Sequence, residues 1–238
     1  MKKTLRLIIR FIAFILLLVI IGLVSIYVIY NEPLPVGKQG PEADALAHKI
    51  LGALNFEAYS ETRYLEWSFK NGKQHYIWDK NLGRVWVQWD AYKIHLRLKN
   101  KKLSKVFKSN RELEGTQKIA LIDEAMALFN NASFWLVAPY KLFDEGITRS
   151  IVRLDDGSEA LLVSYKSKAN EVGDTYLWKL QPNGFPISYQ MWVGILPIGG
   201  LEATWDDWQI VESGAFLPKS HEVGPIKIKM GQVRGYEN

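Results

Sequence analysis

The sequence of 238 residues contains no cysteine. This absence excludes disulfides, thiolate zinc sites and cysteine nucleophiles together. It also excludes the acylation of bacterial lipoproteins, which requires a cysteine. Any stable fold must therefore come from packing, and the high aromatic content of 13% is typical of a packed domain and not of a disordered chain.

The body of the chain has almost no excess of charge. The formal net charge is +5, but four of the 30 basic residues, Lys2, Lys3, Arg6 and Arg10, stand at the N-terminus, where residues 1–30 contain no acid. Removing these four leaves 26 basic against 25 acidic residues. Domains that bind nucleic acid usually carry a basic excess, so we expect no nucleic-acid partner.

Motifs of catalysis and metal binding are also missing. The sequence has no G-x-S-x-G elbow, and its four histidines form no H-x-x-x-H pair that would place two imidazoles on one helical face. Adjacent acidic residues occur, but we interpret them as turn or surface residues: Asp123-Glu124, Asp155-Asp156 and Asp206-Asp207. We therefore predict no catalytic residue, no metal and no cofactor, and keep a hydrolase with dispersed catalytic residues as the least favoured alternative.

The strongest positive pattern is an apolar run of twenty residues, 11–30, broken only by Gly22 and Ser25. About 20 apolar residues span a bilayer as a helix. Basic residues precede the run, whereas Asn31 and Glu32 follow it, and this asymmetry favours a cytoplasmic N-terminus. We predict a single-pass anchor over residues 1–30, with residues 7–30 in contact with the membrane and the body outside the cytoplasm.

A cleaved signal peptide is the alternative interpretation of this run. Signal peptides usually have an apolar core of about 7–15 residues that ends at an A-x-A-like site. The run here is longer, and the matching letters, Ala45-Leu46-Ala47, stand only after a polar stretch that is rich in proline. We favour a retained anchor.

A linker and a helix follow. Residues 31–41 contain three prolines, and Pro41 opens a helix in which Ala43, Leu46, Ala47 and Ile50 recur at three- and four-residue spacing. We assign residues 42–238 to one domain.

From residue 58 the apolar period changes to two, which is typical of strands. Asn71-Gly72 and Asp156-Gly157 predict hairpin turns, and residues 166–173 a polar loop. A further loop over residues 194–200 is apolar and flexible. We expect about eleven strands in one antiparallel meander, including a long strand over residues 202–212 and closing strands over 217–223 and 226–233. So many antiparallel strands tend to curl, and the predicted fold is mainly β with α, an open barrel.

Residues 115–143 form the helical insert in this meander. Residues 118–129 predict an amphipathic helix with Asp123 and Glu124 in water, which Asn130 and Asn131 can end. Residues 134–143 are too apolar for a simple connector. We expect the insert to be a lid over the opening of the curved sheet.

This order of elements resembles the bacterial lipoprotein-carrier fold, which includes the periplasmic lipoprotein chaperone of the localisation pathway and its outer-membrane receptor. Residues 173–193, GDTYLWKLQPNGFPISYQMWV, are similar to the late hairpin of that family. The resemblance implies an open barrel that holds acyl chains beneath inserted helices. It also implies a place in the periplasm, on the bacterial inner membrane, although a tethered chain cannot shuttle freely between membranes.

We therefore expect a membrane-anchored periplasmic protein that binds an apolar ligand, either a lipid or the acyl chains of an acylated protein. About 12 buried methylenes would supply on the order of 10 kcal/mol before ordering costs. The alternatives are a ligand-free envelope assembly module that docks partners through Trp135 and Leu136, and an anchored hydrolase. Core packing is the plain alternative for each predicted ligand-binding residue: Trp67, Phe69, Trp78, Trp86, Met126, Phe134, Trp135, Leu136, Tyr140, Trp178, Met191 and Trp192.

Overall fold

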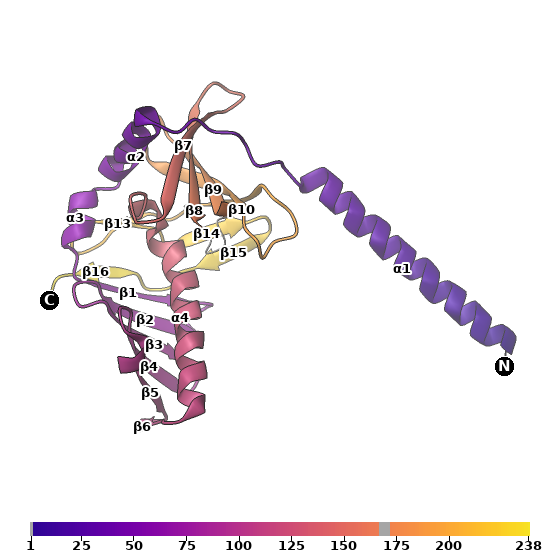
Figure 1. The fold of residues 1–238 in the computed structure, drawn as a ribbon, viewed down its shortest axis with the longest axis horizontal. Coiled ribbons are helices and arrows are strands. Elements are labelled where there is room, and N and C mark those ends of the chain that lie inside the picture. Colours follow the sequence, from indigo (N-terminus) through magenta and orange to yellow (C-terminus); the bar gives the residue numbers. More distant parts are fainter. Residues whose placement is uncertain (1, 167–171) are drawn as a thin grey trace.

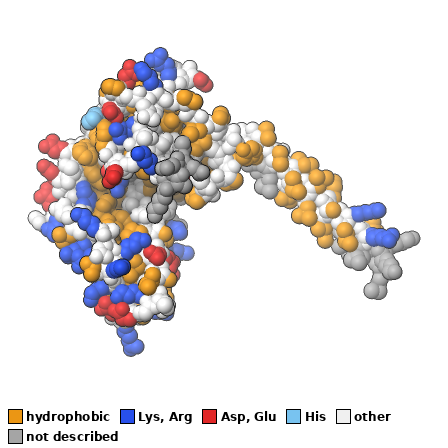
Figure 2. Space-filling model, viewed as in Figure 1, with side chains coloured by type: hydrophobic (Ala, Val, Ile, Leu, Met, Phe, Trp, Pro, Cys, Tyr) orange, Lys and Arg blue, Asp and Glu red, His pale blue; other side chains and the backbone are white. Residues whose placement is uncertain are grey.

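The computed structural model describes residues 2–166 and 172–238. Its first helix, α1 (Lys2–Tyr30), projects away from the body, and Figure 1 shows no other element beside it. The stretch Ile9–Tyr30 has a mean hydropathy of 3.2 and is 0% buried. Figure 2 shows hydrophobic side chains along α1 and basic ones near its N-terminal end. The helix is long and apolar enough to cross a membrane, which fits an anchor and a signal sequence alike.

The first antiparallel sheet has seven strands in the order β16-β1-β2-β3-β4-β5-β6. One face of this sheet is apolar, with Leu65, Trp78, Val85 and Leu96 in one cross-strand row. The strands are β1 (Tyr64–Phe69), β2 (Gln74–Asp79), β3 (Arg84–Trp89), β4 (Tyr92–Arg97), β5 (Lys105–Lys108), β6 (Arg111–Glu112) and β16 (Arg234–Tyr236).

The second antiparallel sheet also has seven strands, in the order β15-β14-β11-β10-β9-β8-β7. They are β7 (Ile147–Arg153), β8 (Glu159–Lys166), β9 (Val172–Leu180), β10 (Pro186–Trp192), β11 (Leu201–Thr204), β14 (Ser220–Val223) and β15 (Ile226–Lys229). A two-stranded sheet pairs β12 (Gln209–Ile210) with β13 (Phe216–Leu217). Five residues of the polar loop expected over 166–173, namely 167–171, lie outside the described residues.

The helices of the body are α2 (Pro41–Ala53), α3 (Phe56–Glu61) and α4 (Thr116–Val137), with short 3-10 turns η1 (Lys101–Leu103) and η2 (Ala138–Tyr140). The helix expected from Pro41 is confirmed, whereas α3 was not expected. Asp123 and Glu124 are exposed on α4, as predicted.

The prediction that Asn130 and Asn131 end the insert helix was wrong. Both are exposed positions inside α4, and the helix continues because Ala132 and Leu136 carry its buried stripe onward with 0% exposure. Asparagine lowers helix propensity only modestly, and that loss is smaller than the gain from burying the next apolar turn. Residues 118–137 are therefore one helix and not two segments.

Helix α4 bridges the two large sheets (Figure 1). Its middle packs on the first sheet, where the ring of Phe129 lies edge-on to Trp78 at 5.2 Å between centroids. Its C-terminal half reaches the second sheet, where Phe134 lies 4.7 Å from Tyr176 between centroids. The η2 turn is held beyond it by the Tyr140 hydroxyl, which lies 2.8 Å from the Leu54 carbonyl oxygen.

The expected class, mainly β with helices and antiparallel sheets, is confirmed, and the described residues form no closed barrel. Four details differ from the expectation. The meander of about eleven strands is divided into sixteen strands in three sheets. The strand expected over 202–212 is broken, because Asp207 takes a φ of +51° between β11 and β12. The C-terminal strand β16 pairs with β1 instead of extending the second sheet, and the β1–β2 connection is a four-residue loop, since Phe69 pairs with Gln74.

Candidate functional site

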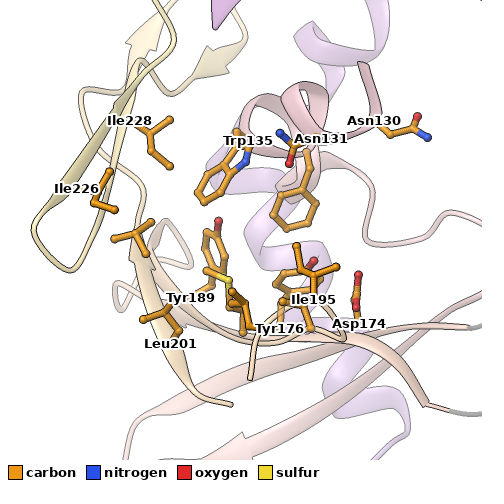
Figure 3. Close-up of a pocket in the computed structure, with 15 residues that line it drawn as sticks. Asn130, Asn131, Trp135, Asp174, Tyr176, Tyr189, Ile195, Leu201, Ile226 and Ile228 are labelled. Atoms are coloured by element: carbon orange, nitrogen blue, oxygen red, sulfur yellow. The ribbon is translucent and has the colours of Figure 1, made fainter. Parts of the chain in front are cut away.

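A hollow of about 410 Å³ lies between the C-terminal half of α4 and the second sheet (Figure 3). The volume is within the range of about 300–1,000 Å³ found for ligand pockets. The lining is mostly apolar and comes from α4, from five strands and from the loop after β10: Asn130, Asn131, Phe134, Trp135, Asp174, Tyr176, Tyr189, Met191, Val193, Ile195, Leu196, Leu201, Val223, Ile226 and Ile228.

From β10 to the edge strand β15, one cross-strand row of the second sheet that borders the hollow has a single aromatic residue, followed by aliphatic ones. Tyr189 of β10 pairs with Ala203 of β11, which pairs with Val223 of β14, which pairs with Ile226 of β15. Side chains directly opposite one another share a face of the sheet. The row therefore ends in aliphatic groups, and Val223 and Ile226 of this row line the hollow together with Trp135 of α4.

Tyr189 is the most deeply buried polar residue of this lining, which also includes Asn130, Asn131, Asp174 and Tyr176. Its side chain is fully buried, and its hydroxyl has no hydrogen-bond partner among the described residues. Figure 3 shows the ring directed toward Trp135. Burial raises the pKa of Tyr189 well above its usual 10, so the hydroxyl keeps its proton and remains a donor. A buried donor without a partner is a place where a ligand oxygen would be stabilised.

His221 lies behind Trp135, with 5.0 Å between the ring centroids. Its Nδ1 lies 2.9 Å from the Thr204 carbonyl oxygen and donates to it, since a carbonyl can only accept. Burial lowers the pKa of His221 to about 4. The ring is therefore neutral at pH 7 and supports Trp135 as an aromatic platform without adding charge.

A second hollow of about 350 Å³ continues this site toward the β1–β2 turn. The two hollows share Asn131, Trp135 and Ile228. Lys70 and Lys229 line the second one, so the apolar space runs toward a basic end.

Three of the twelve predicted ligand-binding residues, Phe134, Trp135 and Met191, line the main hollow. Phe69 lines the second one. Met126 is half-buried on α4. Five belong to the closed core, where they are less than 10% exposed and lie away from both hollows: Trp67, Trp78, Leu136, Tyr140 and Trp178. Most of the predicted ligand-binding tryptophans therefore do not line either hollow.

Trp86 and Trp192 lie on the outer faces of their sheets. Trp86 pairs across the strands with Ile77 and His95, and its ring stacks on His95 at 4.0 Å, opposite to the apolar face. Trp192 packs beside Leu177 on the far side of the second sheet. The physical reason is strand alternation, because neighbouring residues face opposite sides. Both residues are corrections to the predicted site.

Leu136 is also a correction as a docking residue. It has 0% exposure, so it cannot meet a partner, and Trp135 is only partly exposed. The residues that sequence reasoning missed are Tyr176, Tyr189 and the aliphatic row of β11, β14 and β15. Tyr189 shares a strand face with Met191, so the alternation of residues 187–193 was the signal that could have found it.

The lining of the main hollow offers few side chains that could take part in catalysis. Its fifteen lining residues include no serine and no histidine, and Asp174 is their only carboxylate. Asp174 is engaged, since its Oδ1 accepts from the Gly194 backbone nitrogen at 3.1 Å. Within the described part of the chain, no group of three histidine or acidic side chains is placed to hold a metal ion. An anchored hydrolase therefore has no support at this site.

No protein-family model and no curated protein matches this chain. Among solved structures, the chain is similar to a DUF1329 family protein from Desulfovibrio piger, with a TM-score of 0.36 and 8% sequence identity over 81% of this chain and 92% of that chain. At this level of similarity, the neighbour carries no argument about the function of this chain.

Proposed function

We propose that this protein is a membrane-anchored binding protein for an apolar chain, such as a lipid or the acyl chains of a lipoprotein, with its body on the periplasmic side of a bacterial inner membrane. The two large sheets are then the walls of an open, barrel-like sandwich. Helix α4 is its cover, and the ligand lies beneath the C-terminal half of that cover.

The observation that carries the proposal is the apolar hollow, whose lining includes the buried and unpaired hydroxyl of Tyr189. Ligand sites are mostly apolar concavities with a few placed polar groups. Here Tyr189 supplies the donor, and the aliphatic side chains of β11, β14 and β15 supply the apolar wall: Leu201, Val223, Ile226 and Ile228. An amphiphile with an oxygen near the start of its chain matches both features.

The energetics are adequate without any charged contact. Each buried methylene contributes about 0.8 kcal/mol. Eight methylenes would supply about 6 kcal/mol before the cost of ordering the chain. The hollow therefore predicts weak to moderate affinity for a chain of ordinary length.

The experiment is to fill the hollow. Leu201 lines it, whereas Leu103 is 65% exposed in η1 and does not line it. Leu201→Trp and Leu103→Trp therefore make the same change inside and outside the site. We expect Leu201→Trp to exclude about three methylenes and to weaken binding of a fluorescent fatty acid by roughly 50-fold. Leu103→Trp should bind as the wild type does.

Equal binding by both variants would contradict the proposal, and so would wild-type protein that takes up no fatty acid and yields no lipid in native mass spectrometry after purification from membranes. The second outcome would favour the ligand-free assembly module. In that case Ile195 and Ile226, which are 92% and 62% exposed at the rim of the hollow, would be the residues to test for partner contact.

A further inference from the structure

The loop between β10 and β11, residues 193–200, is an apolar segment that is partly exposed. Its sequence, VGILPIGG, has no charged or hydrogen-bonding side chain, and Ile195 is 92% exposed. A single exposed isoleucine is common on soluble proteins and needs no explanation. This loop differs from a single exposed residue because it is held next to the end of α1.

The loop is tied to the two residues that follow α1. The Gly199 nitrogen donates to Asn31 Oδ1 at 2.8 Å, and the Glu32 nitrogen donates to the Gly199 carbonyl at 3.0 Å. At the base of the loop, Trp192 Nε1 donates to the Glu32 carbonyl at 2.8 Å. The last turn of α1 runs into this contact, since the Asn31 nitrogen donates to the Tyr27 carbonyl.

Glycines make the approach possible. A Cβ at Gly199 would lie 2.3 Å from Cδ1 of Trp192, and a Cβ at Gly200 would lie 2.6 Å from Cβ of Glu32. Gly200 also has a φ of +82°, in the region that favours glycine. The end of α1 and the loop are thus fitted to one another and do not merely touch.

This contact fixes the depth of the loop relative to a membrane that holds α1. Two residues of chain span at most about 7 Å, so the C-terminal end of the loop, at Gly199, lies within about that distance of the end of the apolar helix, and Ile195 is four residues further along the loop. The polar interface of a bilayer extends about 5–7 Å beyond each side of its hydrocarbon core. An apolar loop held there lies at the depth where interfacial apolar groups bind.

The same loop forms part of the wall of the hollow, because Ile195 and Leu196 line it (Figure 3). We propose that residues 193–198 dock on the bilayer beside α1, so that the hollow opens toward the lipid and not toward water. This inference rests on the part of the proposed function in which α1 is a retained anchor. It adds that the ligand enters from the adjacent leaflet without crossing the aqueous phase.

The absence of cysteine gives a clean test, since any introduced cysteine is unique. The full chain would be reconstituted in vesicles of phosphatidylethanolamine and phosphatidylglycerol, with an environment-sensitive fluorophore at Ile195→Cys. Ile210→Cys is the matched control, because Ile210 is 65% exposed in β12 and its partner strand β13 lies on the side of the body away from α1 (Figure 1). We expect lipids with nitroxide on the acyl chain to quench the label at 195 several-fold more than the label at 210.

A third label, at Val19→Cys within α1, separates failure of the docking from failure of the anchor. Quenching at 19 together with equal, weak quenching at 195 and 210 would overturn the docking and leave the anchor standing. A label at 19 that stays accessible to an aqueous quencher would overturn both. Binding of fatty acid in the hollow is measured separately by the filling variant, so neither result decides that question.

Discussion

The substitution Tyr189→Phe separates a functional hydroxyl from a structural one. The Tyr189 hydroxyl is buried without a partner in the hollow, and the pKa of this group is raised by burial, so it stays protonated. Removing it leaves the aromatic ring and its neighbours in place, including Trp178 at 5.3 Å between centroids. The stability of the ligand-free protein and the affinity for a ligand should therefore change in opposite directions.

The magnitude follows from the state of the hydroxyl. A buried polar group without a partner costs about 1–3 kcal/mol, so Tyr189→Phe should stabilise the lipid-free protein by about 1 kcal/mol. For a chain of this size that corresponds to a rise in Tm of about 2–4 °C. If the ligand accepts a hydrogen bond from Tyr189, its loss should cost about 1 kcal/mol, which is about fivefold in Kd.

The chain offers a matched control in Tyr140. Its hydroxyl lies 2.8 Å from the Leu54 carbonyl oxygen and 2.6 Å from the Phe216 carbonyl oxygen, so the proton is used. Tyr140→Phe should destabilise the protein by about 1 kcal/mol. The assay is thermal unfolding of the full chain in detergent, followed by near-UV circular dichroism, after lipid has been exchanged away, and then titration with a fluorescent fatty acid and with an alkane of equal length.

The two tyrosines must give opposite signs for the reasoning to stand. If Tyr189→Phe lowers Tm as Tyr140→Phe does, the Tyr189 hydroxyl has a structural partner. It is then not free to donate a hydrogen bond to a ligand. If Tyr189→Phe weakens the fatty acid and the alkane equally, the hydroxyl does not recognise an oxygen of the ligand.

Three further changes are predicted. The folded pKa of His221, about 4, lies below its unfolded value of 6.5. The stability that its neutral ring contributes is therefore complete above pH 6.5 and is lost as the pH falls toward 4. Between pH 7 and pH 5, the free energy of unfolding should fall by about 2 kcal/mol more in the wild type than in His221→Leu. Gly199→Ala should overpack the contact with the end of α1 by about 1–3 kcal/mol and speed exchange of the amide at residue 199, whereas Gly194→Ala, with open space around its Cβ, should change neither. Leu136→Ala should lose about 2–5 kcal/mol in urea unfolding if α4 is one helix into the core, against less than about 0.5 kcal/mol for the exposed Leu103→Ala.

Local signals in the sequence carried most of the correct predictions. The helix from Pro41 and the hairpin turn at Asp156-Gly157 each depend on a few neighbouring residues, and the structure has both. The apolar run that becomes α1 is equally local. The partition of the strands into two sheets depends on contacts far apart in the chain. The pairing of β16 with β1 joins residues 64–66 to 234–236, and no local pattern encodes it.

The tryptophans show where sequence reasoning about the site failed. Both faces of strand β3 carry large side chains. Val85 and Val87 lie on one face, and Arg84, Trp86 and Gln88 lie on the other. Size alone favoured Trp86 as an inward residue. Its two polar neighbours on the same face were the better guide, because a strand with one wet face keeps its charged residues there. The ring covers that face beside His95, with Lys93 Nζ 4.8 Å from its centroid.

The middle and the C-terminal half of α4 differ in how completely the space against the sheets is filled. Against the first sheet, Trp67 stacks on Tyr76 at 4.8 Å and Phe129 lies close to both Trp67 and Trp78, so the space is filled. Against the second sheet, the row that begins at Tyr189 ends in short aliphatic groups on β14 and β15. In the described residues β15 pairs only with β14, so this wall is held by one ladder of hydrogen bonds. The first sheet therefore holds the middle of α4 in a filled core, whereas this wall of the hollow is formed by the edge of the second sheet.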